Sequence, residues 1–293
     1  MRDNQLFSPK EVAHALGVSE ASIKRWGDKG LISCIKTSGG HRKVPLHSLR
    51  EYLHKNKKVL INPEVLNIPT NTGRTKDKMV QATTELQNAF IKCDEYKIRG
   101  ILYDLFLAGV SVENIFDKLL APALHQLGCN WEKGNIDAFQ ERRAVQICTR
   151  VLYGFDSFFP QPEKDAPVAL LGTLSNDPYT IPILMVEVCL RSLGWRTEFL
   201  GNHLPAESYV KAIEMYKPNL TAISISFIDD QQDLTKTLLS IEKVAISQKS
   251  GLAIGGRAAP SNSTNILQKS LFVDSIQNFK EELPNYLDDI KNT

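Results

Sequence analysis

The side chains near the start of the chain that are best suited to chemistry are cations. Lys24 and Arg25 are adjacent, and three more basic residues follow in one run. Ammonium and guanidinium groups bind phosphate oxygens, and a guanidinium can also contact the edge of a base. The predicted nucleic-acid contacts are Ser22, Lys24, Arg25, His41, Arg42 and Lys43.

Two short helices must position these cations. Ser8 and Pro9, followed by spaced apolar residues, predict a helix that Ser8 caps and Gly17 ends. After a tight turn, Ser19 is expected to cap a second helix whose cations face outward. The inward positions of this second helix are expected to be Ala21, Ser22, Ile23 and Trp26.

A hairpin is expected to carry the second group of cations. Leu31–Ile35 and Lys43–Leu46 flank Thr37-Ser38-Gly39-Gly40, which predicts two strands with a basic tip. This order of helix, turn, helix and hairpin resembles the MerR family of transcriptional regulators in EVAHALGVSEASIKRWGDKGLI and SGGHRK. The resemblance implies contact with double-stranded promoter or operator DNA, with the second helix in the major groove. It also implies a homo-oligomer, because operators of this kind are repeated or palindromic.

Charge separates the start of the chain from the rest. Residues 1–60 contain 12 Lys and Arg against 5 Asp and Glu, whereas the remainder contains 23 against 28. The five cysteines are scattered without a Cys-x-x-Cys pair, so the sequence suggests neither a disulfide framework nor a zinc site. No apolar run approaches ~20 residues, which argues against a membrane span. We therefore expect a cytoplasmic protein with a cationic nucleic-acid module.

The sequence predicts a multidomain chain. Residues 1–58 are expected to form the winged helix-turn-helix unit, called here the head, and residues 59–76 a linker. Residues 77–158, the bundle, show helical spacing, and the fourth of its four helices is expected to begin near Asp137 and bury Phe139.

From Val168 onward, apolar strands alternate with helices, so residues 165–293 are predicted to form a doubly wound, Rossmann-like α/β domain. Ligands of such folds bind at the carboxyl ends of the strands. The loops expected around a site are Leu174–Pro182, Ser224–Asp229 and Gly255–Pro260.

The bundle and α/β domain together resemble the cobalamin-binding module of light-sensing, CarH-like MerR relatives. The matching pieces are LLGTLSND, LGW…FLGNHLP, and several single residues. The ligand-pocket candidates that the resemblance implies are Trp131, Glu141, Arg142, Asp177, Tyr179, Ser224, Ser226, Gly255 and Gly256.

The chain departs from this family at the cobalt-ligand motif. The family's loop is Asp/Glu-x-His-x-x-Gly, in which the histidine is the lower ligand of cobalt; here Tyr179 and Pro182 replace the histidine and the glycine. A phenol, with a pKa near ~10, is a poor cobalt donor unless it is ionised. In the bundle, the family's Trp-x9-Glu-His pattern ends in Arg142 instead of histidine.

These observations predict a transcriptional regulator whose sensor module no longer uses histidine-ligated cobalamin. We expect no cofactor and no metal; the alternative is a sensor that binds cobalamin or another tetrapyrrole with unusual ligation. A second alternative is an antirepressor-like protein that regulates through a protein partner. We expect no enzyme, because the sequence contains no nucleophile–base pair and no phosphate-binding glycine loop.

Overall fold

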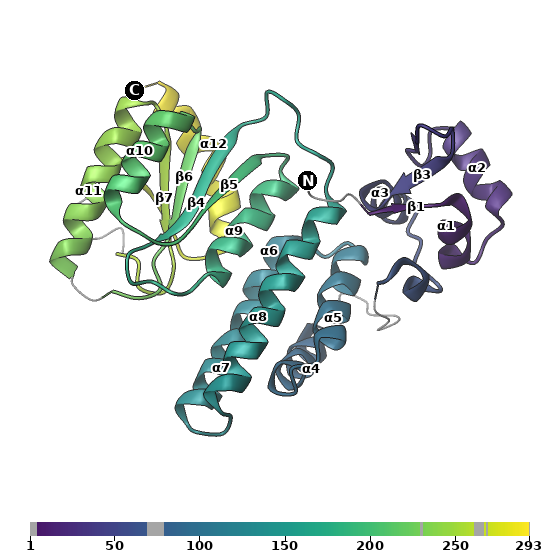
Figure 1. Ribbon diagram of the computed structural model, residues 1–293, viewed down its shortest axis with the longest axis horizontal. Coiled ribbons are helices and arrows are strands. Elements are labelled where there is room, and N and C mark those ends of the chain that lie inside the picture. Colours follow the sequence, from purple (N-terminus) through teal and green to yellow (C-terminus); the bar gives the residue numbers. More distant parts are fainter. Residues whose placement is uncertain (1–4, 69–78, 229–230, 261–266, 268, 293) are drawn as a thin grey trace. The chain divides into compact units, whose positions relative to one another are not determined.

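The computed structural model describes residues 5–68, 79–228, 231–260, 267 and 269–292. Contacts divide the chain into two compact units, residues 1–160 and 161–293, and each is described by itself below (Figure 1). Residues 69–76 of the predicted linker and Asp229 of a predicted site loop lie outside the described residues.

The head is a helix-turn-helix with a small antiparallel sheet. Its elements are β1 (Leu6–Phe7), α1 (Pro9–Leu16), α2 (Glu20–Asp28), β2 (Ile35–Lys36), β3 (Arg42–Pro45) and α3 (Leu46–Lys55). Strand β3 lies between β1 and β2 and pairs antiparallel with both. The hairpin strand expected at Leu31–Ile35 is wrong except at Ile35, because the strand is β2 at Ile35–Lys36. Strand β1 was not expected, because two residues carry no periodicity.

The buried face of α2 is narrower than predicted. Ile23 is fully buried and Trp26 stacks on Tyr52 with ring centroids 4.9 Å apart. Ala21, expected to face inward, is exposed. Residues two apart lie on opposite sides of a helix, so Ala21 cannot share the inward face with Ile23.

The first part of the predicted linker packs on the head. The backbone N–H groups of Ile61 and Asn62 donate to the carbonyl of Ala15, at 2.7 and 3.1 Å, and the Asn62 side chain donates to His14 O. A short 3₁₀ helix, η1 (Pro63–Leu66), follows. Carbonyls in the last turn of a helix lack partners within it, and this segment supplies them for α1.

The bundle contains four helical stretches, as predicted. They are α4 (Met79–Ile91); α5 (Glu95–Leu107); the continuous run α6 (Val112–Ile115), η3 (Phe116–Leu120) and α7 (Ala121–Glu132); and α8 (Ala138–Gly154), followed by η4 (Phe155–Phe158). Helix α8 begins beside Asp137, as predicted, and the Asp137 side chain caps it. Phe139, however, is 67% exposed, so its predicted burial is wrong. It stands in the first turn of α8, and the buried stripe begins only at Ala144.

The bend expected at Pro122 takes the form of a π-helical stretch. Residues Phe116–Leu120 are π-helical, and the N–H of Ala121 donates to Phe116 O. Pro122 has no N–H to offer the preceding turn and its ring crowds that turn, so the hydrogen-bond ladder shifts just before it.

Helix α3 of the head lies against the bundle within the first unit. The Arg50 guanidinium carbon is 3.8 Å from the centre of the Phe106 ring on α5. Burial lowers the pKa of Arg50, and its Nε has no hydrogen-bond partner. Phe106 also contacts Phe155, Phe158 and Phe159 edge-on, so the head rests on the bundle's aromatic core.

The second unit, residues 161–293, is the predicted doubly wound α/β fold and is called here the α/β unit. Its elements are β4 (Val168–Leu174), α9 (Ile181–Ser192), β5 (Arg196–Leu204), α10 (Ala206–Tyr216), β6 (Leu220–Ser224), α11 (Gln231–Ser247), β7 (Gly251–Gly255), β8 (Leu271–Val273) and α12 (Ile276–Lys291). All strands pair parallel in the order β5-β4-β6-β7-β8. Helices α10 and α11 cover one face of the sheet, and α9 and α12 the other (Figure 1).

The order reverses between β4 and β6, which places the expected ligand edge at their carboxyl ends. The core behind this edge is built from alternate strand residues and helix side chains, including Leu170, Ile223 and Ile254 against Tyr209 of α10. Gly256, just after β7, has a φ of +105°. A Cβ there would lie 2.4 Å from the carbonyl oxygen of Ile225, so the fold itself requires a glycine.

We predict that Gly256→Ala destabilises the α/β unit more than Gly194→Ala does. Gly194 also has a positive φ, of +85°, but a Cβ there meets nothing within 4 Å. Both variants incur left-handed strain of about 1–2 kcal/mol, and Gly256→Ala adds an overpacking cost of about 1–3 kcal/mol. Urea unfolding followed by circular dichroism measures both. Equal losses of unfolding free energy would show that the contact with Ile225 relaxes without cost.

Candidate functional site

The start of α1 is fixed by a reciprocal cap. The N–H of Ser8 donates to the Glu11 carboxylate at 2.6 Å, and the N–H of Glu11 donates to Ser8 Oγ at 3.2 Å. The Ser8 hydrogen bonds hold the pKa of Glu11 below its usual value. With Pro9 at the first helical position, this capping box sets where Lys10 leaves the helix.

Helix α2 presents its cations to solvent. The Ser19 hydroxyl accepts from the N–H of Ser22 at 3.2 Å and caps the helix, as predicted. Ser22 Oγ also lies 3.0 Å from Ser19 Oγ, so its hydroxyl takes part in the cap. Lys24 and Arg25 are exposed on the opposite side from Ile23.

The hairpin, called here the wing (residues 35–45), closes through two backbone hydrogen bonds. Thr37 N–H donates to His41 O at 2.9 Å and Gly40 N–H donates to Thr37 O at 2.8 Å. Lys36 pairs with Arg42, and Ile35 with Lys43. This register places the cations of β3 directly after the turn.

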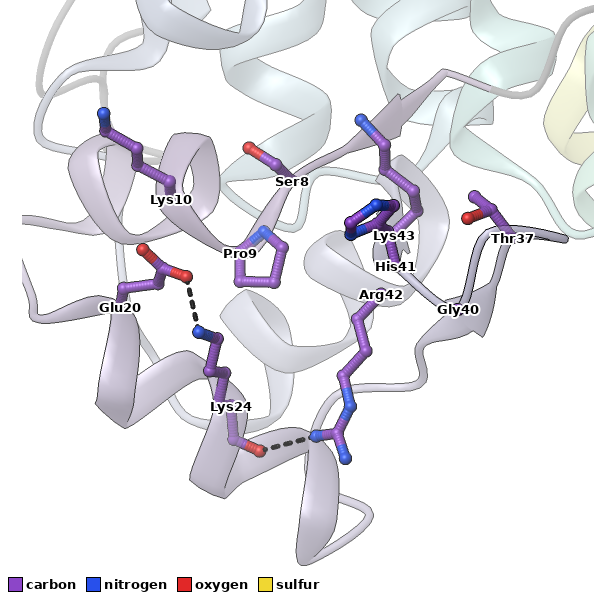
Figure 2. A pocket seen from close by; sticks show the side chains of 10 residues that line it. All are labelled: Ser8, Pro9, Lys10, Glu20, Lys24, Thr37, Gly40, His41, Arg42 and Lys43. Carbon is purple, nitrogen blue, oxygen red and sulfur yellow. Dashed lines mark hydrogen bonds and ion pairs between the residues drawn. The ribbon is translucent and has the colours of Figure 1, made fainter.

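The wing and the two helices enclose a cleft of about 570 Å³ (Figure 2). Cations and hydroxyls dominate its lining, with one acidic side chain. The lining residues are Ser8, Pro9, Lys10, Glu20, Lys24, Thr37, Gly40, His41, Arg42 and Lys43.

The structure brings together four of the six predicted contacts: Lys24, His41, Arg42 and Lys43. Ser22 and Arg25 lie on α2 but do not line the cleft. Lys10 was missed by the sequence prediction, although its position directly after Pro9, at the start of a capped helix, was a usable signal. The cleft therefore draws on three separate elements for its positive charge.

Two cations of the cleft are already paired. Lys24 Nζ lies 2.8 Å from Glu20 Oε1, one turn earlier on the same helix. Arg42 Nη2 lies 2.6 Å from Asp28 Oδ1, and Arg42 Nη1 donates to Lys24 O at 3.3 Å. The Arg42 side chain consequently extends from the wing toward α2, which Figure 2 shows for the bond to Lys24 O.

A second candidate site lies at the carboxyl edge of the α/β sheet, where Asp177 is fully buried. Its Oδ1 accepts the N–H of Tyr179 at 3.0 Å, and its Oδ2 accepts the N–H of Ser226 at 2.5 Å. Asp177 O accepts from the Thr173 hydroxyl at 2.9 Å. These contacts tie the loop after β4 to the end of β6. Strand β6 ends at Ser224, and Ser226 belongs to this junction.

Tyr179, which takes the place of the family's histidine, is 40% exposed. The Arg257 guanidinium carbon lies 5.1 Å from the centre of its ring, within the range of a cation–π contact. Arg257 Nε donates to Ser226 O at 3.0 Å. Arg257, which the sequence prediction missed, therefore links the Tyr179 loop to the segments that follow β6 and β7.

Ser224 stands in register between Thr173 of β4 and Gly255 of β7. Alternation along the strands places these three residues on the face of the sheet covered by α9 and α12, opposite Ile223 and Tyr209. Ser224 is buried, and its hydroxyl has no hydrogen-bond partner. The edge thus contains two buried polar atoms whose partners are not supplied by the described residues, Ser224 Oγ and Asn202 Oδ1 of β5.

The three bundle candidates stand at adjoining helix ends. Trp131, near the end of α7, is 44% exposed. Glu141 lies 3.6 Å from Arg142 Nε in the first two turns of α8. No group of three or more His, Cys, Asp or Glu residues suited to a metal ion occurs among the described residues. In the same residues, no helix combines the length and the apolar character that a membrane span requires.

Two family models match parts of the chain. A helix-turn-helix domain model matches residues 6–57, which is the head, and a B12 binding domain model matches residues 83–153, which is the bundle.

Curated relatives share this combination. The chain is 27% identical over 169 residues to the HTH-type transcriptional repressor CarH of Myxococcus xanthus, covering 58% of this chain. It is 21% identical over 223 residues to the repressor CarA of the same organism, covering 73% of this chain and 75% of CarA. The match to CarH spans about half of that protein, 55% of its length.

The fold also occurs in a solved corrinoid protein. The monomethylamine corrinoid protein of Methanosarcina barkeri superposes with a TM-score of 0.58 at 14% identity, covering 70% of this chain and 98% of that protein. At this identity the likeness shows the fold alone. By these matches the chain resembles CarH-like regulators, with a helix-turn-helix head followed by a cobalamin-binding-type module.

Proposed function

We propose that this chain is a transcriptional regulator that binds double-stranded promoter DNA through the head. The observation that carries the proposal is the cleft formed by α1, α2 and the wing, with Lys10, Lys24, His41 and Lys43 in its lining. Cations on separate rigid elements can contact several phosphates along one strand at once. The excess of seven positive charges in residues 1–60, against an excess of five negative charges in the remainder, favours the head as the DNA-binding part.

Within the head, the position of each residue decides whether it is assigned to phosphates, to base edges or to the fold. Lys10 and Lys43 line the cleft and are assigned to phosphates. Arg25 is exposed on α2 outside the cleft, and it is assigned to the major groove, where a guanidinium can contact the acceptors of guanine. Ser22 is assigned to the cap of α2, because its hydroxyl and N–H both meet Ser19.

We infer further that the cobalamin-binding-type module acts as a sensor without histidine-ligated cobalamin. The loop that would supply the ligand has Tyr179 in the histidine's place, and both oxygens of Asp177 accept backbone N–H groups. Releasing Asp177 to orient a metal ligand would leave the buried N–H of Ser226 unpaired, at about 1–3 kcal/mol, and would also free the partly buried N–H of Tyr179. With Tyr179 in place, the loop therefore does not fit a cobalt ligand.

The adjoining part of the edge fits a ligand better. Ser224 Oγ is a buried hydroxyl without a partner, and it could hydrogen-bond the nucleotide tail of cobalamin. Gly255 contributes little open space, because a Cβ there would lie 3.0 Å from Val273 Cγ2. When bound, cobalamin would supply a corrin-held cobalt; the protein's part would be to hold the tail. Ser224 therefore favours, as the second candidate function, a cobalamin or tetrapyrrole sensor with unusual ligation.

We expect Lys43→Ala to weaken DNA binding about threefold to tenfold and to reduce the slope of log affinity against log salt by about 1, since one phosphate contact is lost. The probe is a duplex enriched by the wild-type protein from a random-sequence library. Lys92→Ala removes an equal charge from an exposed site in the bundle and serves as the control. Equal affinities for wild type and Lys43→Ala would contradict the assignment and favour regulation through a protein partner.

Arg25→Ala is expected to change selectivity more than affinity for random DNA. Loss of a base contact should reduce discrimination against a mismatched base by about 1–3 kcal/mol at one position of the enriched site. Binding to single-base variants of the enriched duplex, compared between wild type and Arg25→Ala, locates that position. A uniform loss at every variant would assign Arg25 to the phosphates instead.

For the sensor module, we expect that titrating the wild-type protein with hydroxocobalamin in the dark gives no absorbance change typical of imidazole coordination. Tyr179→His is expected to produce that change, because it places an imidazole in the loop. Tyr216→His, at an exposed position on α10, is the matched control. An imidazole-type absorbance change with the wild-type protein would overturn the inference. If the wild-type protein retains cobalamin through gel filtration but shows no such absorbance change, that result would support unusual ligation.

A further inference from the structure

We propose that Arg42 is a positioning residue of the head: it fixes the wing against helix α2, and neighbouring cations contact the phosphates. The proposal rests on the proposed function and deepens it, because it separates two roles within one run of basic residues. Arg42 had been expected to contact DNA together with His41 and Lys43.

The geometry that carries the proposal is the pair of contacts from the Arg42 guanidinium to α2. One terminal nitrogen lies 2.6 Å from the Asp28 carboxylate, and the other donates to the carbonyl of Lys24. Asp28 is the last residue of α2, and Lys24 is one turn earlier. A single side chain of β3 thus bridges the wing to the C-terminal turn of the helix expected to enter the groove.

The direction of the strand explains why neighbouring cations differ. Successive side chains of a strand point to opposite faces, and Figure 2 shows Arg42 extending toward α2 while Lys43 extends the other way. The Arg42 side chain is 34% exposed and already meets a carboxylate. A phosphate would have to displace Asp28 from it. Lys43 forms no ion pair among the described residues, and the charge of Glu11 acts on it only at longer range.

Gly27 provides room for the segment that leads into the wing. A Cβ at Gly27 would lie only 3.0 Å from Cys34 Sγ, whereas its 3.7 Å distance to Arg42 Nη1 would be an ordinary contact. Glycine inside a helix is unfavourable, and here it lets Cys34 lie close to the helix backbone. The hold on the wing itself comes from the contacts of Arg42 with Asp28 and with Lys24 O.

The deciding experiment measures whether Asp28→Asn weakens or strengthens DNA binding. If Arg42 positions the wing, Asp28→Asn should weaken binding to the enriched duplex about twofold to fivefold, the range for an exposed ion pair. The salt slope should stay unchanged, because no phosphate contact is lost. If Arg42 contacts DNA directly, removal of a nearby negative charge should leave affinity equal or raise it, and that result would overturn the proposal.

Glu20→Gln is the matched control. It removes an equal charge from α2 and breaks an exposed pair, that of Lys24 with Glu20, but it frees no residue of the wing. We expect affinity equal to or tighter than that of the wild type. Weakening by both variants to the same extent would assign the effect to charge on α2 rather than to Arg42 and would overturn the proposal.

The Arg42 contacts that hold the wing against α2 are called here the clamp. Hydrogen exchange measured without DNA tests the clamp independently of the proposed function. In Asp28→Asn, the amides of Thr37 and Gly40, which close the wing, should exchange faster than in wild type, while those buried in α1 stay unchanged. Unchanged wing exchange would overturn the clamp even if DNA binding is confirmed. If the wing amides exchange faster in Asp28→Asn but the wild-type protein binds no duplex, the clamp is supported and the proposed function is contradicted.

Discussion

A buried carboxylate determines what the carboxyl edge of the α/β sheet can do. A charged group removed from water must be fully hydrogen-bonded or it destabilises the fold. Asp177 meets this requirement with two backbone N–H groups, one from its own loop and one from the segment after β6. The loop is therefore closed by the fold's own backbone. An imidazole introduced at position 179 would have to coordinate without orientation by Asp177.

The network around Asp177 extends into the neighbouring strand. The Thr173 hydroxyl donates to Asp177 O and accepts the N–H of His203, which has a left-handed φ of +57°. The Tyr209 hydroxyl donates to Thr173 O, and burial raises the pKa of Tyr209, so the phenol stays a donor at neutral pH. These hydrogen bonds thus join the ends of strands β4, β5 and β6 at the place where the strand order reverses. Rigidity there suits a sensor that responds to occupancy nearby.

The sequence was informative where signals are local. Caps at Ser8, Ser19 and Asp137 marked helix starts because a side-chain oxygen satisfies N–H groups only a few residues away. The β4–β8 sheet followed from apolar strands separated by helices of suitable length. Phe139 was misplaced because burial depends on which turn of a helix meets a neighbour, and Ala21 because it lies on the opposite side of its helix from Ile23. Asp28, fourteen residues before Arg42, the residue of β3 that pairs with it, carried no local signal at all.

In the candidate sites, too, residue types could be predicted from the sequence, but long-range contacts could not. Residue types predicted a cationic cleft, and Lys24, His41, Arg42 and Lys43 line it. Their partners could not be predicted, because ion pairs such as Arg42 with Asp28 join segments distant in sequence. Ser224 was proposed from a family motif, yet the feature that makes it a candidate is physical: a buried hydroxyl without a partner. Gly256 came from the same motif, but its close approach to Ile225 explains it without a ligand.

Regulation requires that the head respond to the rest of the chain, and the first unit contains a contact suited to that purpose. Arg50 of α3 lies on Phe106, whose ring is part of the aromatic core that also includes Phe155 and Phe158. Helix α8, which carries Glu141, runs directly into that core through η4. A guanidinium held over an aromatic ring with its Nε unpaired is incompletely satisfied there. Helices α3 and α8 therefore meet the same aromatic core, and α3 follows directly from β3, the strand that holds the wing.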